Sequence, residues 1–208
     1  MRTLTAESDT ADRILGAARE RLLSGGYAGL STRKVASQAG VPVSQVHYHF
    51  GSKGAMVLAL LESENQRRLG RQARMYAEDV PMWQRYEQAC DFLDEDLDSG
   101  YVRVLQELIA AGWSTPEIGA AAQRLLAGWY ALLTEVAEEA AKRFGGLGPF
   151  TPAEIATLIG NAFIGSEALL LLGFDPNQLP IRASLRRIAD VIRTAEAAHP
   201  GRRKGRKP

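Results

Sequence analysis

Apolar residues recur at helical spacing along almost the whole chain, and no segment shows the strict alternation of a half-buried strand. The apolar face of the first segment consists of Ala11, Ile14, Leu15, Ala18 and Leu22. Glycine pairs, prolines and hydroxyl residues mark the ends of the segments. We therefore predict an all-α fold with helices over about 11–24, 31–40, 42–50, 52–77, 81–99, 101–113, 115–145, 151–172 and 180–198.

One segment, Ser31–Lys53 (STRKVASQAGVPVSQVHYHFGSK), predicts two short helices joined by a tight turn. Ala36 and Gly40 lie at its inside corner, where a small side chain permits close approach and glycine can adopt the left-handed conformation. On the second helix, Val46 and Phe50 share one side. The other side carries Ser44, Gln45 and Tyr48, flanked by His47 and His49. Such hydroxyl, amide and imidazole groups can reach base edges or phosphates.

Cations stand at the starts of two predicted helices, Arg33 and Lys34 at one and Lys53 at the other. A positive charge there opposes the helix dipole and costs a few tenths of a kcal/mol (about 0.3 or more). A docked anion reverses this penalty, since helix amides and cations then bind it together, with Thr32 and Ser52 adding hydroxyl donors. The arrangement predicts a DNA-binding helix-turn-helix. The alternative is a helical hairpin with a solvated polar face.

Charge is distributed unevenly along the 208 residues, although the net charge is only +1. Residues 1–60 carry seven basic and four acidic residues, residues 61–201 carry thirteen and twenty, and the tail RRKGRKP adds five basic residues. A basic front, an acidic body and a basic tail indicate that part of the surface meets a polyanion.

Other classes of function find no support in the sequence. The single cysteine, Cys90, suits a reducing compartment, and the first ten residues contain no apolar run of a secretory signal, so we expect a cytoplasmic protein. No phosphate loop, nucleophile elbow, zinc-protease helix or cysteine ligand pair is present. His47 and His49, two residues apart, point in different directions on a helix. We therefore expect neither an enzyme nor a cofactor nor a bound metal.

Residues 10–60, above all VHYHFGSK after the turn glycine, resemble the TetR (tetracycline-repressor-like) family of bacterial transcription regulators. The resemblance implies a homodimer that binds an operator in double-stranded DNA, with a larger domain for a small-molecule effector. It also implies phosphate contacts at Thr32, His47, Tyr48, His49 and Lys53. Positions that often meet bases correspond to Arg33, Val43, Ser44 and Gln45. Pro42, Gln45 and His47 depart from the family's usual serine, threonine and tyrosine, which leaves the operator sequence open.

The expected domains are a DNA-binding domain at 9–52, a ligand-binding and dimerisation domain at 53–198, and a disordered basic tail at 199–208. An apolar effector pocket is expected among the aromatic residues of the larger domain, with polar anchors. The candidates are Trp83, Tyr86, Leu105, Glu107, Ile109, Trp113, Trp129, Tyr130, Asn161, Phe163 and Glu167. The alternative for the aromatics is a structural core, and for Glu167 an ion pair across the dimer with Arg186 or Arg187.

The stretch Ile155–Phe174 is apolar enough to span a membrane, but Asn161, Ser166 and Glu167 lie within it and no aromatic belt flanks it. We favour a helix buried on several sides, as in a subunit interface, and expect no membrane partner. The predicted helices over 151–173 and 180–197 are the expected dimer surface. Gly160, Ala162, Gly165 and Ala168 would permit close helix packing there.

Overall fold

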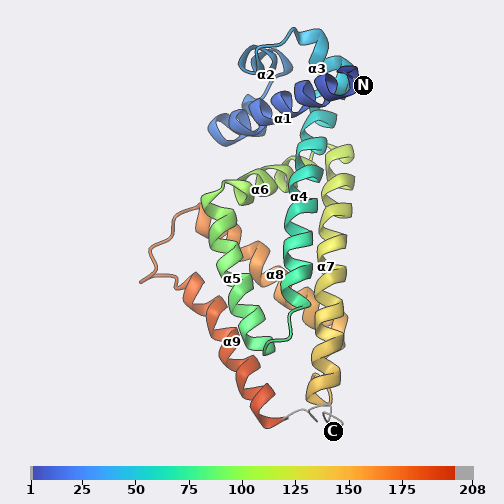
Figure 1. Cartoon of the computed structure of the whole chain (residues 1–208). Coiled ribbons are helices and arrows are strands. Elements are labelled where there is room, and N and C mark those ends of the chain that lie inside the picture. Colours follow the sequence, from blue (N-terminus) through green and yellow to red (C-terminus); the bar gives the residue numbers. More distant parts are fainter. Residues whose placement is uncertain (1, 200–208) are drawn as a thin grey trace. The chain divides into compact units, whose positions relative to one another are not determined.

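A computed structural model describes residues 2–199, and all nine elements in this range are α-helices (Figure 1). The predicted all-α fold is confirmed. The helices are α1 (Arg2–Gly29), α2 (Thr32–Ala39), α3 (Val43–Phe50), α4 (Lys53–Tyr76), α5 (Met82–Asp98), α6 (Tyr101–Gly112), α7 (Pro116–Phe144), α8 (Pro152–Leu171) and α9 (Ile181–Ala198). Of the expected disordered tail, all but His199 lies outside the described residues.

The helices form two compact units. The N-terminal unit contains α1 to α3, α4 as far as Arg68, α6, and α7 as far as Leu125. The C-terminal unit contains the rest of α4, α5, the rest of α7, α8 and α9. The expected division after residue 52 differs from this one, because α6 and the start of α7 pack with the N-terminal helices although they lie far from them in sequence.

The core of the N-terminal unit is apolar and excludes solvent. Its fully buried side chains include Ile14, Leu22, Val35, Val46, Met56 and Val57, each at most 1% exposed. Burial of one such side chain contributes about 1.5–3 kcal/mol. These residues come from α1, α2, α3 and α4, so one apolar cluster sets the positions of the two short helices.

Helix α1 is interrupted at Gly26, whose φ of 65° and ψ of 178° lie outside the helical region. Side chains other than glycine rarely adopt this conformation. The backbone N–H of Tyr27 donates to Oε2 of Glu107 in α6 at 3.1 Å. The predicted end of the helix at Gly25-Gly26 therefore corresponds to a real break, although a further short turn follows it.

In the C-terminal unit, α9 runs alongside α5 (Figure 1). Their buried contact includes Leu93 of α5 and Leu185 and Ala189 of α9. Ion pairs reinforce the exposed side of this contact: Arg182 with Asp94 at 2.7 Å, Arg186 with Asp91 at 2.7 Å, and Arg193 with Glu87 at 3.1 Å. Exposed ion pairs of this kind contribute about 0.2–1 kcal/mol each, so apolar burial carries most of the contact.

Helix α8 begins with a capping box. The N–H of Glu154 donates to the Thr151 hydroxyl at 3.3 Å, while the N–H of Thr151 donates to the Glu154 carboxylate at 2.7 Å. These hydrogen bonds lower the pKa of Glu154. Among the described helices, α8 is the one that passes a membrane-span test of length and composition, and only 22% of its apolar window is buried. The expectation of burial on several sides is therefore not met within a single chain.

Candidate DNA-binding surface and ligand cavity

The turn between α2 and α3 has the geometry of a helix-turn-helix. Ser31 caps α2, since its hydroxyl accepts from the N–H of Lys34 at 3.3 Å. Gly40 adopts the left-handed conformation with φ 65° and ψ 37°. The N–H of Val41 donates back to the carbonyl of Ala36 at 3.0 Å. The small residue and the glycine thus take the places that their spacing predicts.

A second helix also holds this turn. Nη2 of Arg13 in α1 donates to the carbonyl of Ala39 at 2.6 Å and to that of Gly40 at 3.3 Å. These carbonyls end α2, where a cation is also favoured by the helix dipole. Arg13 is a positioning residue that the sequence analysis missed, since only the crossing of α1 and α2 brings it to the turn.

The polar side of α3 faces outward, as the helical wheel predicts. Val46 is buried, whereas Ser44, His47 and Tyr48 are exposed, Tyr48 to 71%. Gln45 is half-buried. Val43, which the resemblance places among positions that often meet bases, is also half-buried.

The two histidines of α3 differ in their surroundings. Nδ1 of His47 lies 3.0 Å from the carbonyl oxygen of Gly51. Because a carbonyl only accepts, Nδ1 must carry a proton, and Nε2 of the neutral ring is then an acceptor. His47 can therefore donate to a phosphate from Nε2 only when the ring is charged. Nε2 of His49 is buried without a hydrogen-bond partner among the described residues.

The cations at the helix starts are partly engaged by backbone groups. Nζ of Lys53 donates to the Tyr27 carbonyl at 2.7 Å and lies 4.2 Å from the centroid of the Tyr27 ring. Burial lowers the pKa of Lys53. Lys34 donates to the carbonyl of Gly29 at 3.3 Å, while Arg33 is exposed and Thr32 is half-buried. An ammonium has three donors, so Lys53 and Lys34 each keep capacity for a phosphate.

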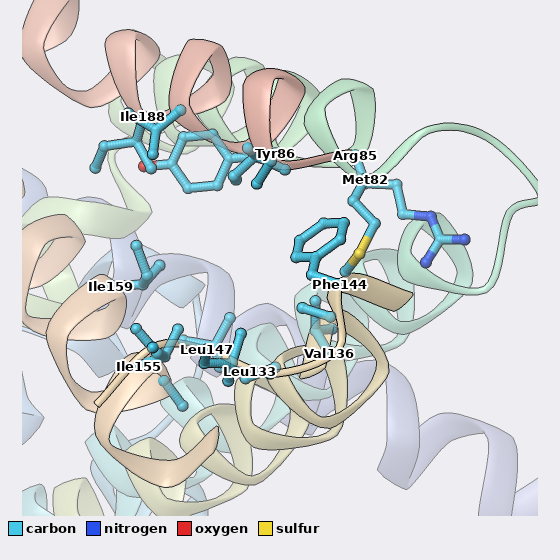
Figure 2. Close-up of a pocket in the computed structure, with 18 of the residues that line it drawn as sticks. Met82, Arg85, Tyr86, Leu133, Val136, Phe144, Leu147, Ile155, Ile159 and Ile188 are labelled. Atoms are coloured by element: carbon cyan, nitrogen blue, oxygen red, sulfur yellow. The ribbon is translucent and has the colours of Figure 1, made fainter. Parts of the chain in front are cut away.

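The C-terminal unit contains a cavity of about 500 Å³ (Figure 2). The side chains that line it are almost all apolar. They come from the end of α4 (Tyr76), α5 (Met82, Arg85, Tyr86), α7 (Leu133, Val136, Ala137, Ala140, Phe144), the 146–148 turn (Gly146, Leu147, Gly148), α8 (Ile155, Ala156, Ile159) and α9 with its cap (Ile188, Val191, Ile192, Ala195, His199). Volume and lining suit a small organic ligand.

Most of the expected pocket residues lie elsewhere, and Tyr86 alone among them lines this cavity. Four of them belong to the N-terminal unit: Leu105, Glu107, Ile109 and Trp113. Leu105 is a buried core residue, Glu107 binds the Tyr27 amide, Ile109 is half-buried, and Trp113 is 85% exposed. These residues do not line this cavity, because aromatic and apolar spacing does not reveal which helix faces converge.

The other expected pocket residues form a structural cluster beside the cavity. The Phe163 ring centroid lies 5.9 Å from that of Tyr86 and 6.4 Å from that of Trp129. The Tyr130 hydroxyl donates to Oδ1 of Asn161 at 2.7 Å. Trp83 stacks under Arg193 at 4.1 Å, and Glu167 is buried. Phe163 and Glu167 are buried, as the core alternative predicts, whereas Trp83, Trp129 and Tyr130 are half-buried and Asn161 is exposed.

The fold and the α2–α3 geometry define a helix-turn-helix protein, and a family model matches its N-terminal part. Residues 14–60 match the model of the bacterial regulatory proteins of the tetR family. This part of the chain is therefore similar to the N-terminal domain of TetR-family transcriptional regulators. No curated protein matches the chain.

Solved structures of transcriptional regulators share the fold beyond that domain. A TetR-family transcriptional regulator from Agrobacterium tumefaciens is 18% identical, with a TM-score of 0.73 over 90% of this chain and 98% of the other. FadR from Bacillus subtilis, in complex with stearoyl-CoA, is 16% identical, with a TM-score of 0.70 over 86% and 96%. A regulator from Saccharomonospora viridis, in complex with choline, is 19% identical, with a TM-score of 0.72 over 88% and 95%.

Proposed function

We propose that this protein is a ligand-responsive repressor, which binds an approximately palindromic operator as a homodimer and is released by a small molecule. The observation that carries the proposal is the outward polar face of α3, held in place by Gly40 and Arg13. A rigid turn fixes the angle at which a recognition helix enters the major groove. In a dimer, two such helices would lie about 34 Å apart, one turn of duplex.

Dimerisation through α8 and α9 is supported by the apolar surface that these helices and their connection expose. Large exposed side chains there are Leu158, Leu171, Leu172, Phe174, Leu179 and Val191. Leu172 is 73% exposed and Val191 66%. Several large apolar side chains exposed on neighbouring elements are typical of a protein interface. Two copies would bury it in a four-helix bundle. The expected pair between Glu167 and Arg186 has a rival, since Arg186 binds Asp91 within its own chain.

An effector role is supported by the C-terminal cavity and by two relatives of the same fold that were solved with stearoyl-CoA and with choline. A ligand shifts the equilibrium only if it prefers one conformation of the protein over another. Release of DNA follows when the preferred conformation no longer matches two successive major grooves.

Selection of binding sites from random duplexes, followed by footprinting on DNA next to the protein's own gene, tests the DNA-binding part. We expect a palindromic site, and Gln45→Ala should relax base preference at one position in each half-site. Equal affinity for random and selected duplexes would indicate an architectural protein without an effector. An absence of binding at low salt would indicate a ligand-binding helical bundle that does not contact DNA.

A further inference from the structure

Only a few polar side chains line the C-terminal cavity, and they restrict the chemistry of its ligand. Among residues 2–199, its lining contains one cationic side chain, Arg85, and no Asp, Glu or Lys. Its remaining polar side chains are Tyr76, Tyr86 and His199, and His199 lies at the exposed end of α9. All other lining residues are apolar or glycine. The inference drawn from these groups rests on the proposed effector role of the cavity.

The cation of the cavity lining, Arg85, is already neutralised by a carboxylate. Arg85 is 3% exposed, and its Nη1 donates to Oε2 of Glu139 at 2.9 Å. Glu139 also binds Arg143 at 2.7 Å, and Arg143 lies 3.5 Å from Glu196, which accepts from the N–H of Met82 at 3.1 Å. Two cations and two carboxylates thus balance in one chain of contacts that joins α5, α7 and α9. A charged ligand group would enter with no counter-charge left for it.

Two donors on α5 remain without a partner. The Tyr86 hydroxyl is buried and makes no hydrogen bond within the described residues, and the same holds for Nε of Arg85. The Tyr86 ring lies across one side of the cavity, while the guanidinium of Arg85 lies beyond Met82 and Phe144 on another side (Figure 2). Burial raises the pKa of Tyr86, which keeps its hydroxyl protonated as a donor. Buried donors without acceptors are rare in folded proteins, and such exceptions point to a missing partner.

We propose that the cavity binds a neutral, mostly apolar molecule with a carbonyl oxygen, which accepts a hydrogen bond from the Tyr86 hydroxyl once the ring turns its buried oxygen toward the cavity. A ketone, an ester or a lactone with a hydrocarbon body of about ten carbons is the class that fits. A carboxylate could accept from Nε of Arg85, but it would add a negative charge to a group of contacts in which Glu139 and Glu196 already balance Arg85 and Arg143. A quaternary ammonium finds no free carboxylate in the lining. A plain alkane fills the cavity but leaves the hydroxyl without an acceptor.

Four probes of matched length test this class: 2-undecanone, undecane, undecanoate and decyltrimethylammonium. Their binding to the full chain is measured by displacement of the neutral dye Nile red and by the shift in Tm. We expect 2-undecanone to bind tightest. Tyr86→Phe should lower the affinity for 2-undecanone by about threefold to tenfold, which corresponds to one hydrogen bond. It should leave the affinity for undecane unchanged. Without ligand, Tyr86→Phe should be as stable as the parent, because it removes a hydroxyl that lacks a partner.

A matched control is Tyr130→Phe. Its hydroxyl is satisfied by Asn161 and it does not line the cavity. This variant should lose stability and keep its affinity for 2-undecanone. Equal losses in both variants, or the tightest binding by undecanoate or decyltrimethylammonium, would overturn the proposed ligand class, and so would failure of all four probes to displace the dye.

The proposed function is tested separately by release of the selected operator. If the carboxylate or the ammonium binds and releases DNA, the effector role stands and the ligand class is wrong. If the ketone binds in a Tyr86-dependent manner without releasing DNA, the ligand class stands and the effector role is wrong.

Discussion

Removal of the Glu107 carboxylate should destabilise the N-terminal unit at one defined amide. The break in α1 at Gly26 frees the N–H of Tyr27 from the helix, and Glu107 accepts it at 3.1 Å. In Glu107→Ala this part-buried donor has no acceptor. A hydrogen bond to a charged group contributes about 1.5–3 kcal/mol, and an unpaired buried donor costs about 1–3 kcal/mol. We therefore expect a loss of about 2 kcal/mol.

Glu107→Gln keeps an acceptor oxygen and removes the charge, so it should lose about half as much, roughly 1 kcal/mol. In a chain of this length, 2 kcal/mol corresponds to a fall in Tm of about 4–8 °C. Glu62→Ala is the matched control, since Glu62 is exposed in the same unit, and it should change stability by less than about 0.5 kcal/mol.

Amide hydrogen exchange at Tyr27 separates this cause from a general loss of stability. Exchange at this amide should accelerate in Glu107→Ala beyond the acceleration of core amides in the same unit. The reasoning fails if Tyr27 exchange matches that of the core, or if the alanine and glutamine variants are equally stable.

Two further outcomes concern the DNA-binding surface. Lys53→Ala should weaken binding to all duplexes alike and reduce the salt slope by about one unit; an unchanged slope would limit Lys53 to its contact with the Tyr27 carbonyl. Gly40→Ala should lower the free energy of unfolding by about 1–2 kcal/mol, because Gly40 has a φ of 65°. Gly40→Asn should lower it less, since asparagine tolerates the left-handed region. Thermal unfolding measures both variants, and equal losses would contradict the left-handed requirement at this position.

The helices could be predicted closely because local residues define their ends. The capping box at Thr151 and Glu154 and the left-handed Gly40 lie where the sequence indicates. The outward face of α3 followed from the helical period alone, and the exposure of Ser44 and Tyr48 agrees with it. Such features depend on residues within about four positions of one another, and these distances are set by the helix itself.

The hydrogen-bond partners of the side chains near the DNA-binding surface could not be predicted from the sequence, and neither could the position of the cavity. Arg13 reaches Ala39 over 26 positions, Lys53 reaches Tyr27 over 26, and Glu107 reaches Tyr27 over 80. The cavity is likewise formed by faces of five helices. The all-α fold and the helix-turn-helix follow from the residues alone, because periodicity and capping are local. Which distant side chains meet depends on how the packed helices cross, and that crossing is set by the shapes of all their buried residues together.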